Sequence, residues 1–86
     1  MARFRIEFSA ESVKVLEGLD KSHSSRIVKK VESIVGNPAR FVERLVGRSE
    51  YKLRIGDYRA ILDIDERQKV IFVRSIGHRR NIYSRK

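Results

Sequence analysis

The segment YKLRIGDYRAIL, residues 51–62, decides how this chain folds. Apolar and polar residues alternate on both sides of Gly56-Asp57, and a Gly-Asp pair between two such runs is typical of a β-hairpin with a two-residue turn. This register places Arg54 directly opposite Arg59. The face expected to pack on the core carries Tyr51, Leu53, Ile55, Tyr58, Ala60 and Leu62. The opposite face carries Lys52, Arg54 and Arg59.

The facing arginines are an unfavourable arrangement unless something negative binds between them. Like charges on directly opposed strand positions, about 5 Å apart, destabilise a sheet. A phosphate would relieve the repulsion, because guanidinium groups match its oxygens. The alternative is an ordinary solvent-facing surface on which long side chains splay apart. The hairpin therefore indicates an anion site without defining a reaction.

The flanking sequence predicts the remaining elements. Strict alternation in residues 3–8 predicts a half-buried strand, and residues 10–35, beginning after the capping residue Ser9, predict a helical hairpin that ends at Gly36-Asn37-Pro38. The expected apolar stripes are Val13, Leu16 and Leu19 in the first helix and Ile27, Val31, Ile34 and Val35 in the second. Residues 39–49 are expected to form a connection that covers an edge of the core. Three more strands are expected over residues 50–55, 58–64 and 69–76.

The order β-α-α-β-β-β predicts an α+β fold in a single small domain, residues 1–86. We expect an antiparallel or mixed sheet with the helical hairpin on one face and a basic C-terminal tail. No internal repeat or low-complexity segment interrupts the chain.

The composition restricts the function classes. Twenty Lys and Arg against 11 Asp and Glu give a net charge of +9, which attracts polyanions such as nucleic acid, an acidic protein or an anionic surface. The chain has no cysteine and only two isolated histidines, so we expect no metal centre and no cofactor. No stretch approaches the roughly 18 apolar residues of a membrane span. We expect a soluble, cytoplasmic protein that does not associate with a membrane.

A second group of cations lies in the C-terminal segment IGHRRNIYSRK, residues 76–86. It contains His78, Arg79, Arg80, Tyr83, Arg85 and Lys86, and no acid. Histidine exchanges protons near neutral pH, arginine stabilises phosphate, and tyrosine stacks on a base, a combination that suits single-stranded RNA. A charged end that only aids solubility is the alternative. If the last strand pairs with the hairpin, both groups of cations meet at one end of the sheet.

Together, YKLRIGDYRAILDID and VIFVRSIGHRRNIY resemble the C-terminal half of the RelE/ParE toxin superfamily, specifically its RelE branch. The resemblance implies the toxin of a type II toxin–antitoxin system that enters the ribosomal A site and cleaves mRNA without a metal. A ribose 2′-hydroxyl would attack the adjacent phosphate and leave a 2′,3′-cyclic phosphate. Implied partners are a RelB-like antitoxin in a hetero-oligomer, the ribosome and mRNA.

The resemblance also implies roles for individual residues. Lys52 matches a candidate general base, Arg59 the arginine that stabilises the scissile phosphate, and Arg79 the arginine that stabilises the transition state or protonates the leaving group. Tyr83 matches the tyrosine that orients the substrate base, and His78 a position where an acid or base occurs. The phosphate-binding expectation extends to Arg54, Arg80, Arg85 and Lys86.

Two questions remain open at the level of sequence. A lysine of ordinary pKa, about 10.4, is protonated at neutral pH, so Lys52 acts as a base only if crowding by cations lowers that value; otherwise it stabilises charge. A ParE-like toxin that targets DNA gyrase and a non-catalytic nucleic-acid-binding module are the alternative functions. Members of the ParE branch generally lack the full set of cations and tyrosine.

Overall fold

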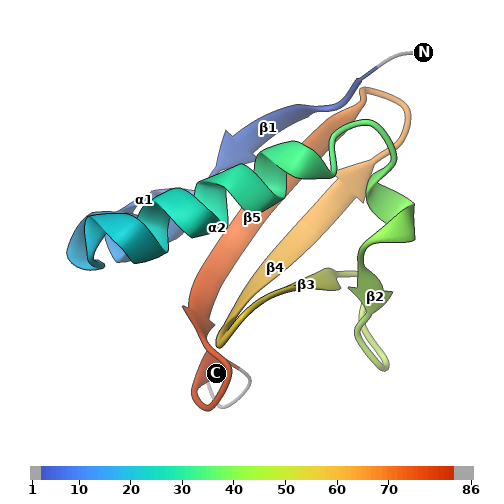
Figure 1. Ribbon diagram of the computed structural model, residues 1–86. Helices are drawn as coiled ribbons and strands as arrows, with labels where there is room; N and C mark the ends of the chain where they lie inside the picture. Colours follow the sequence, from blue (N-terminus) through green and yellow to red (C-terminus); the bar gives the residue numbers. More distant parts are fainter. Residues whose placement is uncertain (1–2, 83–86) are drawn as a thin grey trace.

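The structure is a computed structural model that describes residues 3–82. Its elements are β1 (Arg5–Phe8), α1 (Ala10–Gly18), α2 (Lys21–Ser33), the 3₁₀ turn η1 (Pro38–Arg40), β2 (Glu43–Arg44), β3 (Tyr51–Ile55), β4 (Tyr58–Asp65) and β5 (Val70–His78). The five strands form one mixed sheet in the order β1-β5-β4-β3-β2, with β1 parallel to β5 and the other pairs antiparallel. Both helices lie on one face of this sheet (Figure 1). The predicted α+β order is confirmed, and residues 43–44 of the expected connection add a short edge strand.

The β3–β4 hairpin has the predicted register. Arg54 faces Arg59, Ile55 faces Tyr58, and the turn between them is Gly56-Asp57. Gly56 has a positive φ of 60°, which a glycine adopts without strain. Successive side chains of β3 and β4 therefore point alternately to the core and to the open face of the sheet, as the sequence indicated.

The core lies between the helices and the inner face of the sheet. The stripe predicted for the second helix is buried throughout, Ile27 and Val31 within α2 and Ile34 and Val35 just after it, because α2 ends at Ser33, before the predicted residue 35. They pack against Leu53, Ile55, Ala60, Leu62, Ile71, Val73 and Ile76 of the sheet. Burial of this apolar surface is the main stabilising contribution to the fold.

The apolar stripe predicted for α1 is wrong in part. Val13 is 40% exposed, whereas Ser12 is fully buried. The single O–H of Ser12 is shared between the carbonyls of Ser9 and Val73, which satisfies the hydroxyl inside the core. Ser9 caps the helix as predicted, accepting a hydrogen bond from the Ser12 amide at 3.0 Å. Ser12, rather than Val13, therefore faces β5 at this turn of α1.

A β-bulge in β5 changes what the open face of the sheet presents. Ile61 pairs with Ser75 but Leu62 pairs with Val73, so Arg74 is the extra residue between them. Arg74 donates to Asp63 across this face at 2.7 Å. The polar face of the sheet is therefore cross-linked by ion pairs at its centre.

The chain turns back on itself after β5. Arg79 to Ile82 form a turn in which the Asn81 amide donates to the His78 carbonyl at 2.9 Å. Ile82 is 6% exposed, and its side chain covers Gly77. The beginning of the predicted basic tail is thus packed onto the sheet. Within residues 3–82, no helix has the length and apolar character needed to cross a membrane.

Candidate functional site

The hairpin holds its two facing arginines in different environments. Arg54 is exposed, whereas Arg59 is only 7% exposed. The Nη1 of Arg59 donates to the carbonyl oxygens of Gly56 and Tyr58, both at 2.8 Å. These dipoles offset part of its charge, which explains how the sheet accommodates two opposed arginines without an acid between them. Both hydrogen bonds use Nη1, so the N–H groups of Nε and Nη2 take no part in them.

Lys52 lies two residues before Arg54 on the same face of β3 and forms an ion pair with Glu43. The distance from Lys52 Nζ to Glu43 Oε1 is 3.3 Å, and the two residues are directly paired across β2 and β3. Sequence reasoning missed Glu43, because a two-residue strand carries no readable alternation. A lysine held beside a carboxylate is placed to carry positive charge.

Arg79 joins the hairpin from a distant part of the sequence. Its amide donates to the Asp57 carbonyl at 2.8 Å, and its Nε lies 3.6 Å from Asp57 Oδ1. The register also pairs Arg59 with Gly77, two residues before Arg79. The structure therefore brings Arg54, Arg59 and Arg79 to one end of the sheet, as the proposed meander predicted.

The His78 side chain lies away from these cations. His78 pairs with Tyr58, and their ring centroids are 5.7 Å apart; Tyr58 in turn contacts His23 of α2 at 5.6 Å. Neighbouring strand positions point to opposite faces, so the imidazole is on the helix side of the sheet. Its Nδ1 accepts a hydrogen bond from the Arg80 amide at 3.2 Å. His78 is therefore placed to hold the turn that carries Arg79.

The other predicted residues differ in how far the structure describes them. Arg80 is exposed in the turn after β5. Tyr83, Arg85 and Lys86 lie outside the described residues.

An ion-pair network lies beside these cations on the open face. Glu50 contacts Arg48 at 3.0 Å and Arg74 at 3.8 Å, and Arg74 also contacts Asp63. The hydrogen bonds from Arg48, with smaller help from the charge of Arg74, lower the pKa of Glu50. The hydrogen bond to Asp63 and its charge raise the pKa of Arg74. These acids offset the charge of the arginines in the middle of the open face.

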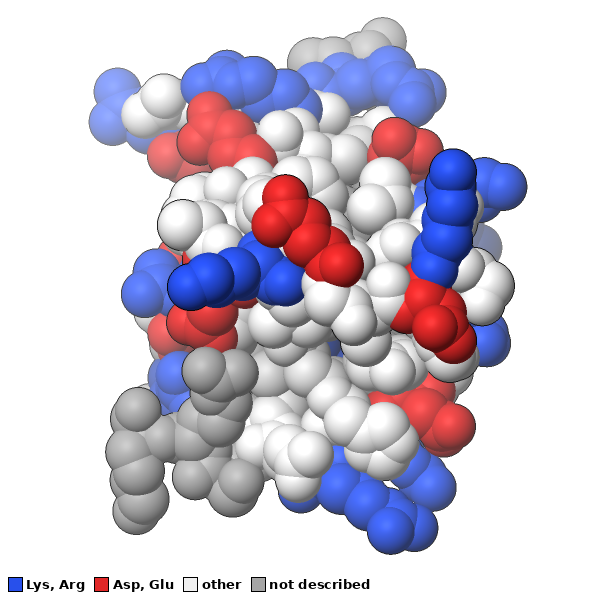
Figure 2. Space-filling model, turned by 90° about the vertical axis from the view of Figure 1, so that its left-hand side faces the viewer, with Lys and Arg blue, Asp and Glu red and all other residues white. Residues whose placement is uncertain are grey.

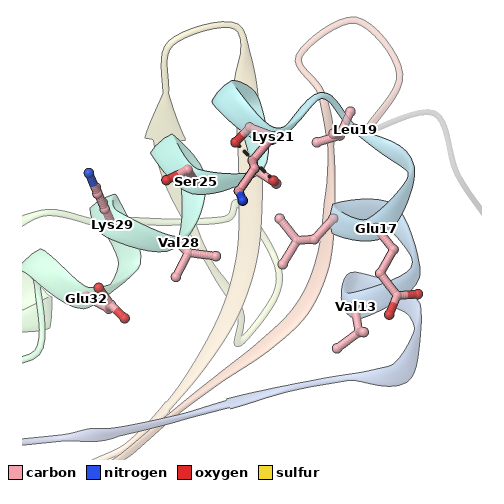
Figure 3. Close-up of a pocket in the computed structure, with 10 residues that line it drawn as sticks. Val13, Glu17, Leu19, Lys21, Ser25, Val28, Lys29 and Glu32 are labelled. Carbon is pink, nitrogen blue, oxygen red and sulfur yellow. Dashed lines mark hydrogen bonds between the residues drawn. The ribbon is translucent and has the colours of Figure 1, made fainter.

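A different kind of surface lies between the two helices. Figure 3 shows this groove, which is lined by apolar side chains such as Val13, Leu19 and Val28 and by charged ones such as Glu17. Seen from the side where α1 and α2 meet, side chains of both charges are interspersed with uncharged surface (Figure 2). An apolar groove with mixed charges at its rim suits a protein partner better than RNA.

The described part of the chain shows no group of three or more His, Cys, Asp or Glu arranged to hold a metal ion. The described residues of the candidate site offer guanidinium groups, the ammonium of Lys52, the carboxylates of Glu43 and Asp57 and the imidazole of His78.

The chain is similar to known toxins of toxin–antitoxin systems, both in sequence and in fold. Residues 6–83 match the family described as the ParE toxin of the type II toxin–antitoxin system parDE. Among solved structures, the RelE–RelB complex of Pyrococcus horikoshii shares 28% identity over 93% of this chain and 99% of that one, with a TM-score of 0.78. The RelBE complex of E. coli shares 26% identity over 90% and 96% of the two chains, with a TM-score of 0.72.

The toxin–antitoxin complex RelBE2 of Mycobacterium tuberculosis has the same fold, with a TM-score of 0.83 at 18% identity over 90% of this chain and 99% of that one. No curated protein matches the chain. The family match spans nearly all of the fold, including the hairpin and the turn that carries Arg79. The chain therefore belongs to the ParE toxin family, within the RelE/ParE superfamily, and is the toxin of a type II toxin–antitoxin system.

Proposed function

We propose that this toxin is a ribosome-dependent endoribonuclease that cleaves mRNA in the ribosomal A site and so inhibits translation. The observation that carries the proposal is the convergence of Arg54 and Arg59 of the hairpin with Arg79, which follows β5. Three arginines from separate segments lie at one end of the sheet, where Arg54 and Arg59 are directly paired across the hairpin. Such a site matches the charge and the geometry of a phosphodiester.

The proposed reaction is an internal transfer at phosphorus. The ribose 2′-oxygen forms a bond to the adjacent phosphorus as it loses its proton, and the bond to the 5′-oxygen breaks as that oxygen gains a proton. The products are a 2′,3′-cyclic phosphate and a 5′-hydroxyl. The transition state gathers negative charge on the phosphoryl oxygens, which fixed guanidinium groups stabilise.

Each residue that the sequence assigns to the site has a proposed role in this reaction. Arg59, held by two hairpin carbonyls, presents a fixed charge to the scissile phosphate. Arg79 stabilises the transition state or protonates the leaving oxygen, and Arg54 contacts an adjoining phosphate. Lys52, beside Glu43, supplies positive charge rather than removing a proton. His78 positions the turn that carries Arg79. Tyr83 orients the base, and Arg80, Arg85 and Lys86 contact flanking phosphates.

We propose a RelB-like antitoxin as the cytoplasmic partner of this toxin. The relatives from Pyrococcus horikoshii and E. coli were solved in complex with RelB-type antitoxins, and both match over nearly their full length. The apolar groove between α1 and α2 offers a surface for such a protein that does not involve the cationic hairpin.

Primer extension on a translated message tests the nuclease proposal. We expect cuts within the A-site codon in the presence of the protein, and their loss in Arg79→Ala with antitoxin binding retained. The matched control is Lys14→Ala, which removes one exposed cation from α1. Absence of cuts with folded protein and ribosomes matched to its source would overturn the proposal.

Inhibition of DNA gyrase is the second candidate, favoured by the ParE description of the matched family. A supercoiling assay separates the two functions. Inhibition of gyrase that persists in Arg79→Ala, without mRNA cleavage, would establish the ParE-like activity. RNA binding without either activity would indicate a non-catalytic binding module.

A further inference from the structure

A basic groove lies between helix α2 and the outer part of β3. Its lining contains the cations Arg26, Lys29, Lys30 and Arg54, and it includes no Asp or Glu. The apolar member of the lining is Ile55, which is only 4% exposed. Long flexible cations therefore dominate the surface that the groove presents. None of the roles proposed above uses the three cations on α2.

The periodicity of α2 builds one wall of this groove. Arg26, Lys29 and Lys30 are spaced by three and four residues, so they share a helix face, while Ile27 and Val31 on another face enter the core. Lys30 is partly held in place, because its Nζ lies 5.6 Å from the centre of the Phe41 ring. The cations are thus aligned along the groove rather than scattered over the surface.

The hairpin turn builds the other wall and depends on Gly56. The guanidinium of Arg26 approaches so closely that a Cβ at position 56 would lie 2.7 Å from Arg26 Nη2. The turn also leaves part of the sheet edge free. Within the described structure, β2 pairs only with Tyr51 and Lys52, so the rest of β3 has a strand neighbour on one side.

Arg54 belongs both to this groove and to the cationic hairpin. Positive charge therefore continues from the candidate cleavage site, around the edge of the sheet, to α2. An RNA backbone bound at the candidate cleavage site could therefore continue into the α2–β3 groove along positively charged surface.

We propose that the α2–β3 groove binds the phosphodiester backbone of an RNA strand outside the scissile phosphate. This proposal rests on the proposed function, because it extends the RNA path of that site. A protein interface would need apolar anchors at its centre, and the groove offers only a buried isoleucine. A nucleic-acid backbone needs aligned cations without apolar anchors, which is what the lining supplies. The backbone belongs either to the message or to ribosomal RNA, and the experiment separates these sources.

The test compares two charge-matched variants. Lys29→Gln/Lys30→Gln removes two cations of the groove from α2, and Lys14→Gln/Lys21→Gln removes one lysine from α1 and one from α2, both outside the groove. Both variants carry the same net charge, so a difference in RNA binding between them reports the position of the cations. Binding is measured by fluorescence anisotropy with a labelled, unstructured RNA oligonucleotide over a range of KCl concentrations. In a second arm, binding is measured with small ribosomal subunits that carry no message. Thermal unfolding confirms that both variants are folded.

We expect the groove variant to bind RNA about three- to tenfold more weakly than the control variant, with the slope of log affinity against log salt reduced by about 1.4 for single-stranded RNA. A loss with the oligonucleotide identifies the message as the ligand, and a loss confined to the ribosomal subunits identifies ribosomal RNA. Equal losses in both variants would show that only net charge matters and would overturn the proposal. Unchanged binding of the groove variant to both the oligonucleotide and the ribosomal subunits would also overturn the proposal, even if antitoxin binding fell.

The outcome is distinct from that of the nuclease test. If the protein cuts no message but the groove variant still loses RNA affinity, the proposed reaction fails and the groove stands. If cleavage occurs and the groove variant behaves like its control, the groove proposal fails alone.

Discussion

Ile82 packs directly on Gly77, so the end of the described chain is fixed to the strand that carries the candidate site. A Cβ at position 77 would lie 2.9 Å from Ile82 Cδ1 and 3.4 Å from Ile82 Cβ. Gly77 faces Arg59 in the register, and the turn between Gly77 and Ile82 contains Arg79. The absence of a side chain at position 77 therefore determines where Arg79 is held relative to the hairpin.

Gly77→Val should displace Ile82 and move the turn that carries Arg79. We expect the free energy of unfolding to fall by about 1–3 kcal/mol, the usual cost of overfilling a packed site. We expect mRNA cleavage to fall by about tenfold or more, because small displacements of a catalytic group are costly. Urea denaturation and primer extension measure the two effects.

The control for this change is Gly36→Ala, where a Cβ would have no neighbour within 4 Å. It should leave both stability and cleavage close to those of the parent protein. Cleavage by Gly77→Val at the parent rate would show that the packing of Ile82 does not position Arg79.

Arg59→Lys should destabilise the protein although it preserves the charge. The lysine lacks the guanidinium fork through which Arg59 bonds the carbonyls of Gly56 and Tyr58, so these lose their partner. We expect a loss of about 1–2 kcal/mol in the free energy of unfolding. Arg54→Lys, at the exposed position opposite, should change it by less than about 0.5 kcal/mol. Equal effects in urea denaturation would contradict a structural role for the Arg59 contacts.

The sequence predicted the site best where a short local motif determines the backbone conformation. The pair Gly56-Asp57 determined the turn, and the turn determined which residues face each other, including Arg54 and Arg59. The same alternation could not reveal that Arg59 bends back onto the turn, because that depends on two carbonyl oxygens rather than on a side-chain pattern. It also gave no sign of the bulge at Arg74, which depends on long-range pairing.

The placement of His78 illustrates the same limit. The segment IGHRRNIY places His78 directly before Arg79 in the sequence. In the sheet, His78 lies beside Tyr58 on the helix side, while the cationic hairpin faces the other way. Consecutive residues of a strand point to opposite faces of the sheet. Residues that are adjacent in the sequence motif at the end of β5 therefore need not lie on the same surface.

The pKa of Glu50 predicts a loss of stability in acid. Its pKa is lowered from 4.5 in the folded protein, mainly by the hydrogen bonds from Arg48, so the carboxylate stabilises the fold above that pH. The contribution falls as the pH drops below 4.5 and the group becomes protonated in the folded protein. We expect Glu50→Gln to lower the melting temperature at pH 7 and to show a shallower decline toward acid. Parallel melting curves of the two proteins across this range would contradict the role of the network.

Lys52→Arg should separate the two roles open to Lys52. Arginine remains charged at any pH suited to the protein and cannot act as a general base. Because Lys52 is paired with Glu43, we expect it to supply charge, and Lys52→Arg should therefore keep most of the cleavage activity. Lys52→Ala should lose it by about two orders of magnitude, in the range found when one charge-stabilising group is removed.

Single-turnover cleavage on programmed ribosomes measures this difference. Glu43→Gln is the companion variant, since it removes the carboxylate without changing the lysine. If Lys52 only supplies charge, the pH dependence of cleavage in Glu43→Gln should keep the shape found in the parent protein. An inactive Lys52→Arg, combined with a shifted pH profile in Glu43→Gln, would instead assign the proton transfer to Lys52.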